Sequence, residues 1–173
     1  GFFVAAPAGI DDALVATAYH VISAGGPFTI EHAVRLSDRE SFVEAYPEVE
    51  VVAFDEDSDL ALIEVKHLPK SRVTALPLAA RAAKDETVIS AGYPASSLTR
   101  RMGLIKKEGK LLDLAKLPTI DELTGSLLRE NAIDGLIIST DIEPGFSGGP
   151  TCNDAGEVVG GNVRKDLRYR GQN

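Results

Sequence analysis

A chain of 173 residues with 44% apolar residues is long enough for one compact domain or for two small barrels that pack together, and it is too apolar to be disordered. Its formal net charge of −8 offers no basic face for nucleic-acid phosphates, so no nucleic-acid partner is expected. No stretch approaches the ~20 apolar residues of a membrane helix, so no membrane span is expected either. The first residues lack the charged start of a signal peptide, and the sequence indicates no compartment.

Short strands are expected in the first third of the chain, because β-prone runs are separated by turn residues such as Pro7 and Gly9. The expected strands are residues 2–4, 13–17, 34–36 and 48–53, with a polar surface loop over 37–47. The second strand delivers His20 at its end, in apolar surroundings that favour a catalytic base. The alternative is an ordinary histidine in a short helix after Thr17. His32 and His67 have no such surroundings and are interpreted as ordinary.

Four acidic side chains fall within residues 54–59. Carboxylates at this density suit a calcium ion, but the glycine and glutamate of an EF-hand loop are missing, so no metal site is expected. Asp59 stands out because it leads directly into the apolar run Leu60-Ala61-Leu62-Ile63, an expected strand that buries the base of Asp59. Its acidic neighbours are interpreted as solvated charges.

The second part of the chain is expected to begin near residues 68–72, where Pro69 and charged residues interrupt the apolar pattern. The expected elements are a strand before Gly92-Tyr93-Pro94, and a hairpin of 102–107 and 110–114 whose exposed turn, Glu108-Gly109, is flanked by lysines. They are followed by a helix around 119–130, a strand over 136–140, and a hairpin of 151–153 and 158–163. The helix rests on a capping-box pattern and on leucines that share one helical face.

The run Glu143-Pro144-Gly145-Phe146-Ser147-Gly148-Gly149-Pro150 carries the strongest chemical signal. Its glycines and prolines allow a sharp turn that aims main-chain N–H groups at one point, and Ser147 is the candidate nucleophile. A plain tight turn is the alternative interpretation. The nucleophile elbow of an α/β-hydrolase is excluded because no histidine follows Ser147 in the sequence. Cys152 is the single cysteine, so no internal disulfide can form, and a buried strand residue is expected there.

Three segments occur in a telling order: TAYHV around His20, DLALIEV from Asp59 and GFSGGP around Ser147. Together they resemble the histidine, aspartate and serine motifs of trypsin-like serine proteases, closest to the bacterial trypsin-like and HtrA-type enzymes. The resemblance spans nearly the whole chain. It implies an all-β chymotrypsin-like fold of two packed, six-stranded-type antiparallel barrels, residues 1–70 and 71–173, in one protease domain. The chain also looks like a module trimmed from a longer protein.

The resemblance further implies a serine endopeptidase that acts on polypeptides without a cofactor. His20 is then the general base, Asp59 orients it, and Ser147 attacks the scissile carbonyl. The main-chain N–H groups of Gly145 and Ser147 hold the oxyanion. The substrate pairs with the last strand, which brings in Gly160, Gly161 and Asn162 as substrate-binding residues, with the two glycines leaving room for the peptide.

The residue before the serine differs from that of the digestive enzymes, and the specificity and the catalytic activity have open alternatives. Those enzymes place an aspartate just before the serine, which pairs with a freshly cleaved N-terminus; here Phe146 stands there, so activation by such cleavage is not expected. Asp141 lies at the position of a primary-pocket acid, which favours Arg or Lys substrates, but a solvated loop acid is an equal alternative. A different class also stays open: a catalytically silent fold that binds a peptide or a partner domain or regulator outside this chain.

Overall fold

The computed structural model describes residues 1–163 except for 24, 26, 36–40, 95–103 and 121–126. Its elements in chain order are β1 (Phe2–Val4), β2 (Asp12–Ala18), α1 (Tyr19–Ser23), β3 (Ile30–Arg35), β4 (Ser41–Tyr46), β5 (Val49–Asp55), β6 (Leu60–Pro69), a 3-10 turn η1 (Lys70–Arg72), β7 (Thr87–Gly92), β8 (Ile105–Ile120), β9 (Leu127–Ile138), β10 (Pro150–Asn153) and β11 (Val158–Gly161). The fold is all-β, as the sequence predicts.

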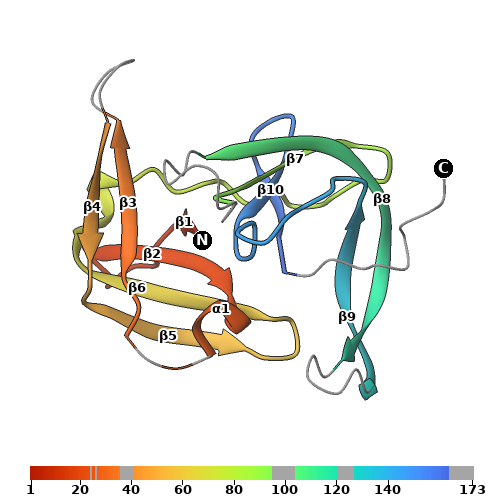
Figure 1. Cartoon of the computed structure of the whole chain (residues 1–173), viewed down its shortest axis with the longest axis horizontal. Coiled ribbons are helices and arrows are strands. Elements are labelled where there is room, and N and C mark those ends of the chain that lie inside the picture. Colours follow the sequence, from red (N-terminus) through yellow and green to blue (C-terminus); the bar gives the residue numbers. More distant parts are fainter. Residues whose placement is uncertain (24, 26, 36–40, 95–103, 121–126, 164–173) are drawn as a thin grey trace.

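The strands form two groups that lie side by side (Figure 1). In the first group the sheet order is β1-β2-β6-β5, and β3 and β4 form a separate pair; in the second group the order is β11-β10-β7-β8-β9. All pairings between named strands are antiparallel. These sheets make the chymotrypsin-like arrangement expected for this sequence. The division of the chain at residues 70 and 71 stays a prediction.

Alternation of apolar side chains builds the core of the first group. In β6 the residues Ala61, Ile63 and Val65 are buried while their neighbours are not, which is the period of a strand with one covered face. Ile63 and Val65 pack with residues of β2, and partly buried side chains such as Phe3 close over them. The central position of β6 between β2 and β5 therefore follows from its sequence.

The structure corrects three local expectations. Residues 41–46 of the expected surface loop form β4, which pairs along its length with β3. Its β-prone side chains, such as Phe42 and Val43, fit a strand better than a loop. Residues 37–40 of that loop lie outside the described residues.

The expected hairpin tip at Glu108-Gly109 lies inside the continuous strand β8, where Val88 pairs with Gly109. A Cβ atom at Gly109 would lie 2.2 Å from Thr140 Oγ1 and 2.9 Å from Ser139 Oγ. This glycine therefore allows a close approach of β8 to the end of β9 and does not mark a turn.

The expected helix around 119–130 is wrong where the structure describes it. Thr119 and Ile120 belong to β8 and residues 127–130 to β9, with Thr119 opposite Arg129 and Ile120 opposite Leu127. Residues 121–126 lie outside the described residues. Ladder pairing between two long strands outweighs a local capping pattern, because a short isolated helix is marginal in water.

Within the described part of the chain, no helix has the length and apolar character needed to cross a membrane.

Candidate active site

His20 and Asp59 are brought together by the register of two paired strands. Ala18 at the end of β2 lies opposite Leu60 at the start of β6, so the residues just beyond these two ends are neighbours. The Tyr19 N–H donates to the Asp59 carbonyl at 3.0 Å, which continues the pairing by one step. His20 follows in the first turn of α1, so the strand ends at Ala18 and a short helix carries the histidine, whose role as a base stays a prediction.

Asp59 holds His20 at two points. One carboxylate oxygen accepts a hydrogen bond from the His20 main-chain N–H at 2.8 Å, and the other lies 2.6 Å from His20 Nδ1. An ionised carboxylate can only accept, so Nδ1 carries the proton and Nε2 is left as the acceptor. The Asp59 side chain is 11% exposed and the His20 side chain 33%, so the carboxylate is shielded while the ring reaches the surface.

The backbone at Asp59 is bent to make this contact. Its φ of 54° lies in the left-handed region, which aspartate tolerates better than most residues. The Asp59 N–H donates to the Glu56 carbonyl at 3.3 Å, so the acidic segment turns tightly into β6. Strain of this kind concentrates at functional sites.

Tyr19, next to His20, covers the acidic segment. Its hydroxyl donates to Glu56 at 2.9 Å, and its ring stacks on Phe54 with centroids 5.0 Å apart. The hydrogen bond to Glu56 raises the pKa of Tyr19, so the phenol stays neutral and keeps donating. From the sequence, Tyr19 is expected only as part of the apolar surroundings of His20, because its hydrogen-bond partner Glu56 lies 37 residues away.

Residues 141–149 form the loop that carries Ser147, called here the serine loop. The Phe146 N–H donates to the Glu143 carbonyl at 3.0 Å, and Gly145 has a φ of +100°. A turn with positive φ at its third residue is type II or type I′, and Pro144 at its second residue excludes type I′ because proline φ is negative. Residues 143–146 therefore form a type II turn. Within the described residues, the amides of Gly145 and Ser147 donate no main-chain hydrogen bond.

The serine loop packs directly on the strand that leads to His20. A Cβ atom at Gly148 would lie 2.2 Å from Thr17 Oγ1 and 2.7 Å from the Ala18 nitrogen. The loop is also tied to the second group of strands, because the Tyr93 N–H donates to the Gly145 carbonyl at 3.0 Å. Backbone contacts thus bring the segment around Ser147 against the end of β2, and no side chain at position 148 would fit between them.

The residues expected to bind substrate lie in or just after β11. A Cβ atom at Gly160 would lie 2.8 Å from Leu136 Cδ1, so the space expected to be left for a peptide is filled by a side chain of β9. This corrects the reason given for Gly160. A Cβ atom at Gly161 would lie 3.7 Å from Leu60 Cδ2, so β11 faces the start of β6 there.

Asn162 is buried and fully engaged in holding the serine loop. Its N–H donates to the Gly149 carbonyl at 2.8 Å and its carbonyl accepts from the Gly148 N–H at 2.7 Å. Its side-chain oxygen accepts a hydrogen bond from Thr151 Oγ1 at 2.8 Å, and Ser90 Oγ lies 2.8 Å from the same Thr151 atom. Substrate binding by Asn162 stays a prediction, because its contacts in the structure are with Thr151 and the serine loop. The sequence carries no local signal for this role.

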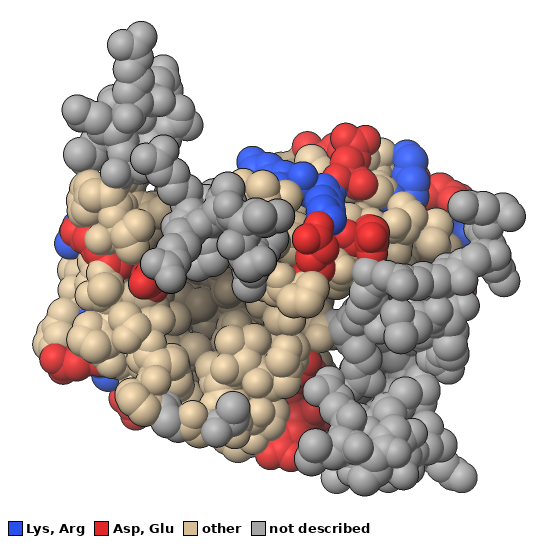
Figure 2. Space-filling model, in the orientation of Figure 1, with Lys and Arg blue, Asp and Glu red and all other residues tan. Residues whose placement is uncertain are grey.

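Charged residues gather over the second group of strands, as the space-filling view shows for one face (Figure 2). Lys107 of β8 donates to the Asp141 carbonyl at 2.8 Å and contacts the Glu143 carboxylate. Asp141 itself is exposed, which agrees with the alternative of a loop acid at the surface. From the sequence, Lys107 is expected beside an exposed hairpin tip, so its contacts with the serine loop are not predicted.

Comparison with known proteins identifies a family and several solved structures that this chain resembles. Residues 1–160 match the family model described as a trypsin-like peptidase domain. The active form of the Rv3671c protease from M. tuberculosis is similar in structure with a TM-score of 0.69 and 25% identity, over 96% of this chain and 63% of that one. Its inactive form gives a TM-score of 0.66 and 24% identity, over 98% and 73%.

The MamO protease domain from Magnetospirillum magneticum shares the fold, with a TM-score of 0.65 and 16% identity, over 94% of this chain and 82% of that one. This chain spans less than two thirds of the length of the active Rv3671c protease chain. No curated protein matches it in sequence. The family match covers most of the chain and contains the His20, Asp59 and Ser147 motifs, and the chain belongs to the trypsin-like peptidase family.

Proposed function

We propose that the chain is a serine endopeptidase that hydrolyses polypeptides through an acyl-enzyme, with His20, Asp59 and Ser147 as its triad. The observation that carries this proposal is the two-point contact between the shielded Asp59 carboxylate and His20, at 2.8 and 2.6 Å. A histidine held in this way keeps the proton on Nδ1 and presents Nε2 as a base. An ordinary surface histidine needs no such clamp.

In the proposed reaction, Ser147 Oγ attacks the carbonyl carbon of the scissile bond while His20 Nε2 takes the hydroxyl proton. Asp59 stabilises the imidazolium that forms. The imidazolium then donates its proton to the leaving amine nitrogen, the C–N bond breaks, and the acyl group stays on Ser147. A water molecule then attacks the ester carbonyl while His20 Nε2 takes its proton. The imidazolium returns this proton to Ser147 Oγ as the ester C–O bond breaks, which releases the acid and restores the starting protonation.

The main-chain amides of Gly145 and Ser147 are the proposed oxyanion donors. The type II turn over residues 143–146 supports this role, because its central peptide is turned over relative to a type I turn and changes the direction of the Gly145 N–H. Two amides without a main-chain acceptor among the described residues are available to an oxyanion. Losing one donor of this kind typically costs 10²–10³-fold in kcat.

The proposed substrate is an extended polypeptide that lies along the last strand, near Gly161. β11 is an edge strand whose second side is paired with Leu78 at Val158 alone among the described residues. Its free edge near Gly161 suits main-chain pairing with a peptide. The preference for the residue before the scissile bond stays a prediction: a basic residue if Asp141 lines the pocket, and no such preference if it is a surface acid.

Labelling with a fluorophosphonate, read out by intact mass, tests the proposal. We expect one adduct on the wild type and none on Ser147→Ala or His20→Ala, because the probe reacts with a serine activated by its base. Ser71→Ala, in the exposed turn η1, is the matched control and should keep the adduct. Mass spectrometry of digested casein should then show internal cuts. An unlabelled wild type would favour the silent, peptide-binding alternative.

A further inference from the structure

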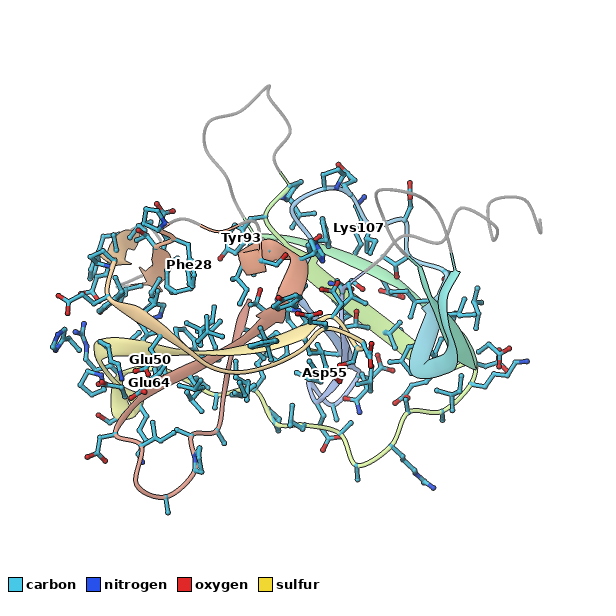
Figure 3. All side chains as sticks on the ribbon, turned by 90° about the horizontal axis from the view of Figure 1, so that it is seen from below. Phe28, Glu50, Asp55, Glu64, Tyr93 and Lys107 are labelled. Atoms are coloured by element: carbon cyan, nitrogen blue, oxygen red, sulfur yellow. The ribbon has the colours of Figure 1, made fainter. Side chains whose placement is uncertain are left out.

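One cation reaches both ends of the turn that precedes Ser147. Lys107 of β8 contacts the Glu143 carboxylate at the start of this turn, and its Nζ lies 5.6 Å from the ring centroid of Phe146 at the end. It also donates to the Asp141 carbonyl at 2.8 Å. Figure 3 labels Lys107 together with Tyr93, the residue after β7 that binds the Gly145 carbonyl.

Phe146 is locked in place below this cation. Its side chain is fully buried, at 0% exposed. A Cβ atom at Gly92 would lie 2.6 Å from both Cα and Cγ of Phe146, so β7 presses directly on one side of the residue. The Lys107 ammonium lies over the ring, where the electron-rich face attracts a cation. Phe146 is thus an apolar anchor that a charge also holds.

We propose that Lys107 is a positioning residue that holds residues 143–146 in the type II turn, so that the serine loop is set for catalysis without a charge delivered by N-terminal cleavage. This inference rests on the proposed function for its catalytic consequence. The sequence has Phe146 where an aspartate would bind a new N-terminus, and Lys107 supplies a fixed cation from within the fold. A lysine that bonds one carbonyl and one carboxylate of the same loop restrains both.

The test uses two readouts on the same variants of the intact chain. The first is the second-order rate of fluorophosphonate labelling of Ser147. The second is amide hydrogen exchange at Phe146, whose N–H closes the turn, measured by NMR; it reports the turn whether or not the serine reacts. Lys107→Met keeps a long apolar stem over Phe146 and removes the charge, Lys107→Arg keeps the charge, and Lys106→Met is the matched control on β8.

We expect Lys107→Met to slow labelling and to speed exchange at Phe146 by about 10-fold or more, because the charge-assisted bonds to the loop are lost. Exchange of buried β2 amides should not change, which separates this effect from lower global stability. Lys107→Arg should lie within about 3-fold of the wild type, and Lys106→Met should behave as the wild type. Added salt should slow labelling of the wild type more than of Lys107→Met, since the pair with Glu143 is partly exposed, at 27% and 45%.

Coupling between Lys107 and Glu143 completes the test. Glu143→Gln and Lys107→Met should be non-additive in both readouts, because each removes the same ion pair. Equal exchange at Phe146 in the wild type and in Lys107→Met would overturn the proposal, and so would an equal effect of Lys106→Met. A wild type that is not labelled, with exchange that still depends on Lys107, would refute the peptidase activity while supporting Lys107 as the residue that holds the turn.

Discussion

Replacing Asp59 by asparagine removes a charge at the site with almost no change of shape. The amide oxygen can still accept from the His20 main-chain N–H, which lies at 2.8 Å. The amide NH₂ then faces Nδ1 at the 2.6 Å contact and must donate to it. Nδ1 loses its proton, the proton moves to Nε2, and Nε2 can no longer accept the serine proton.

We therefore expect Asp59→Asn to fold normally and to react about 10⁴-fold more slowly, which corresponds to about 5.5 kcal/mol of transition-state stabilisation. The assay is the second-order rate of fluorophosphonate labelling at neutral pH, with circular dichroism to check the fold. Asp154→Asn, in the exposed turn after β10, is the matched control and should label at the wild-type rate. A rate for Asp59→Asn within tenfold of the wild type would show that Asp59 does not set the tautomer of His20.

Two further predictions concern the second group of strands. Thr151→Val removes the hydroxyl that donates to the buried Asn162 oxygen at 2.8 Å, so the free energy of unfolding should fall by about 1–3 kcal/mol in urea titrations, whereas an unchanged midpoint would mean that another donor replaces it. Burial raises the pKa of the Cys152 thiol above its ordinary value, so its alkylation by iodoacetamide should level off at a higher pH than that of free cysteine measured beside it, and levelling at the same pH would contradict this.

The sequence predicts the positions of His20 and Asp59, because both depend on strands that lie next to them in the chain. The strand leading to His20 is predicted from a β-prone run and the strand following Asp59 from an apolar run, and both residues stand within two positions of a strand end. Antiparallel pairing of these two strands then brings the side chains together. The all-β fold follows in the same way from short apolar runs between turn residues.

The features that the sequence does not predict depend on partners outside the local segment. Thr119 carries a capping pattern for a helix, but its pairing with Arg129 in the β8–β9 ladder decides its structure. From the sequence alone, Lys107 is an ordinary surface lysine. Its proposed role at the serine loop depends on Glu143, 36 residues later, which lies against β8. Local propensity is a weak guide wherever a tertiary contact of this kind competes with it.

Two glycines at the contact between the two groups of strands have different expected roles: Gly148 belongs to the expected sharp turn, and Gly161 is expected to leave room for a peptide. Their distances to the neighbouring strand ends give a paired prediction. Gly148 has a φ of +73°, and a Cβ atom there would lie 2.7 Å from the Ala18 nitrogen, whereas a Cβ atom at Gly161 would lie 3.7 Å from Leu60 Cδ2, an ordinary contact. Gly148→Ala therefore combines left-handed strain with a backbone clash.

We expect Gly148→Ala to lower the free energy of unfolding by about 2–5 kcal/mol, which lowers the Tm of a chain of this size by about 5 °C or more. Gly161→Ala, a matched change at the same contact, should leave the Tm equal or slightly higher, because alanine restricts the unfolded chain. Calorimetry of the two variants decides the matter. Equal Tm losses would mean that glycine at this contact is needed for backbone freedom in general, and a Gly148→Ala variant as stable as the wild type would mean that the serine loop does not press on β2.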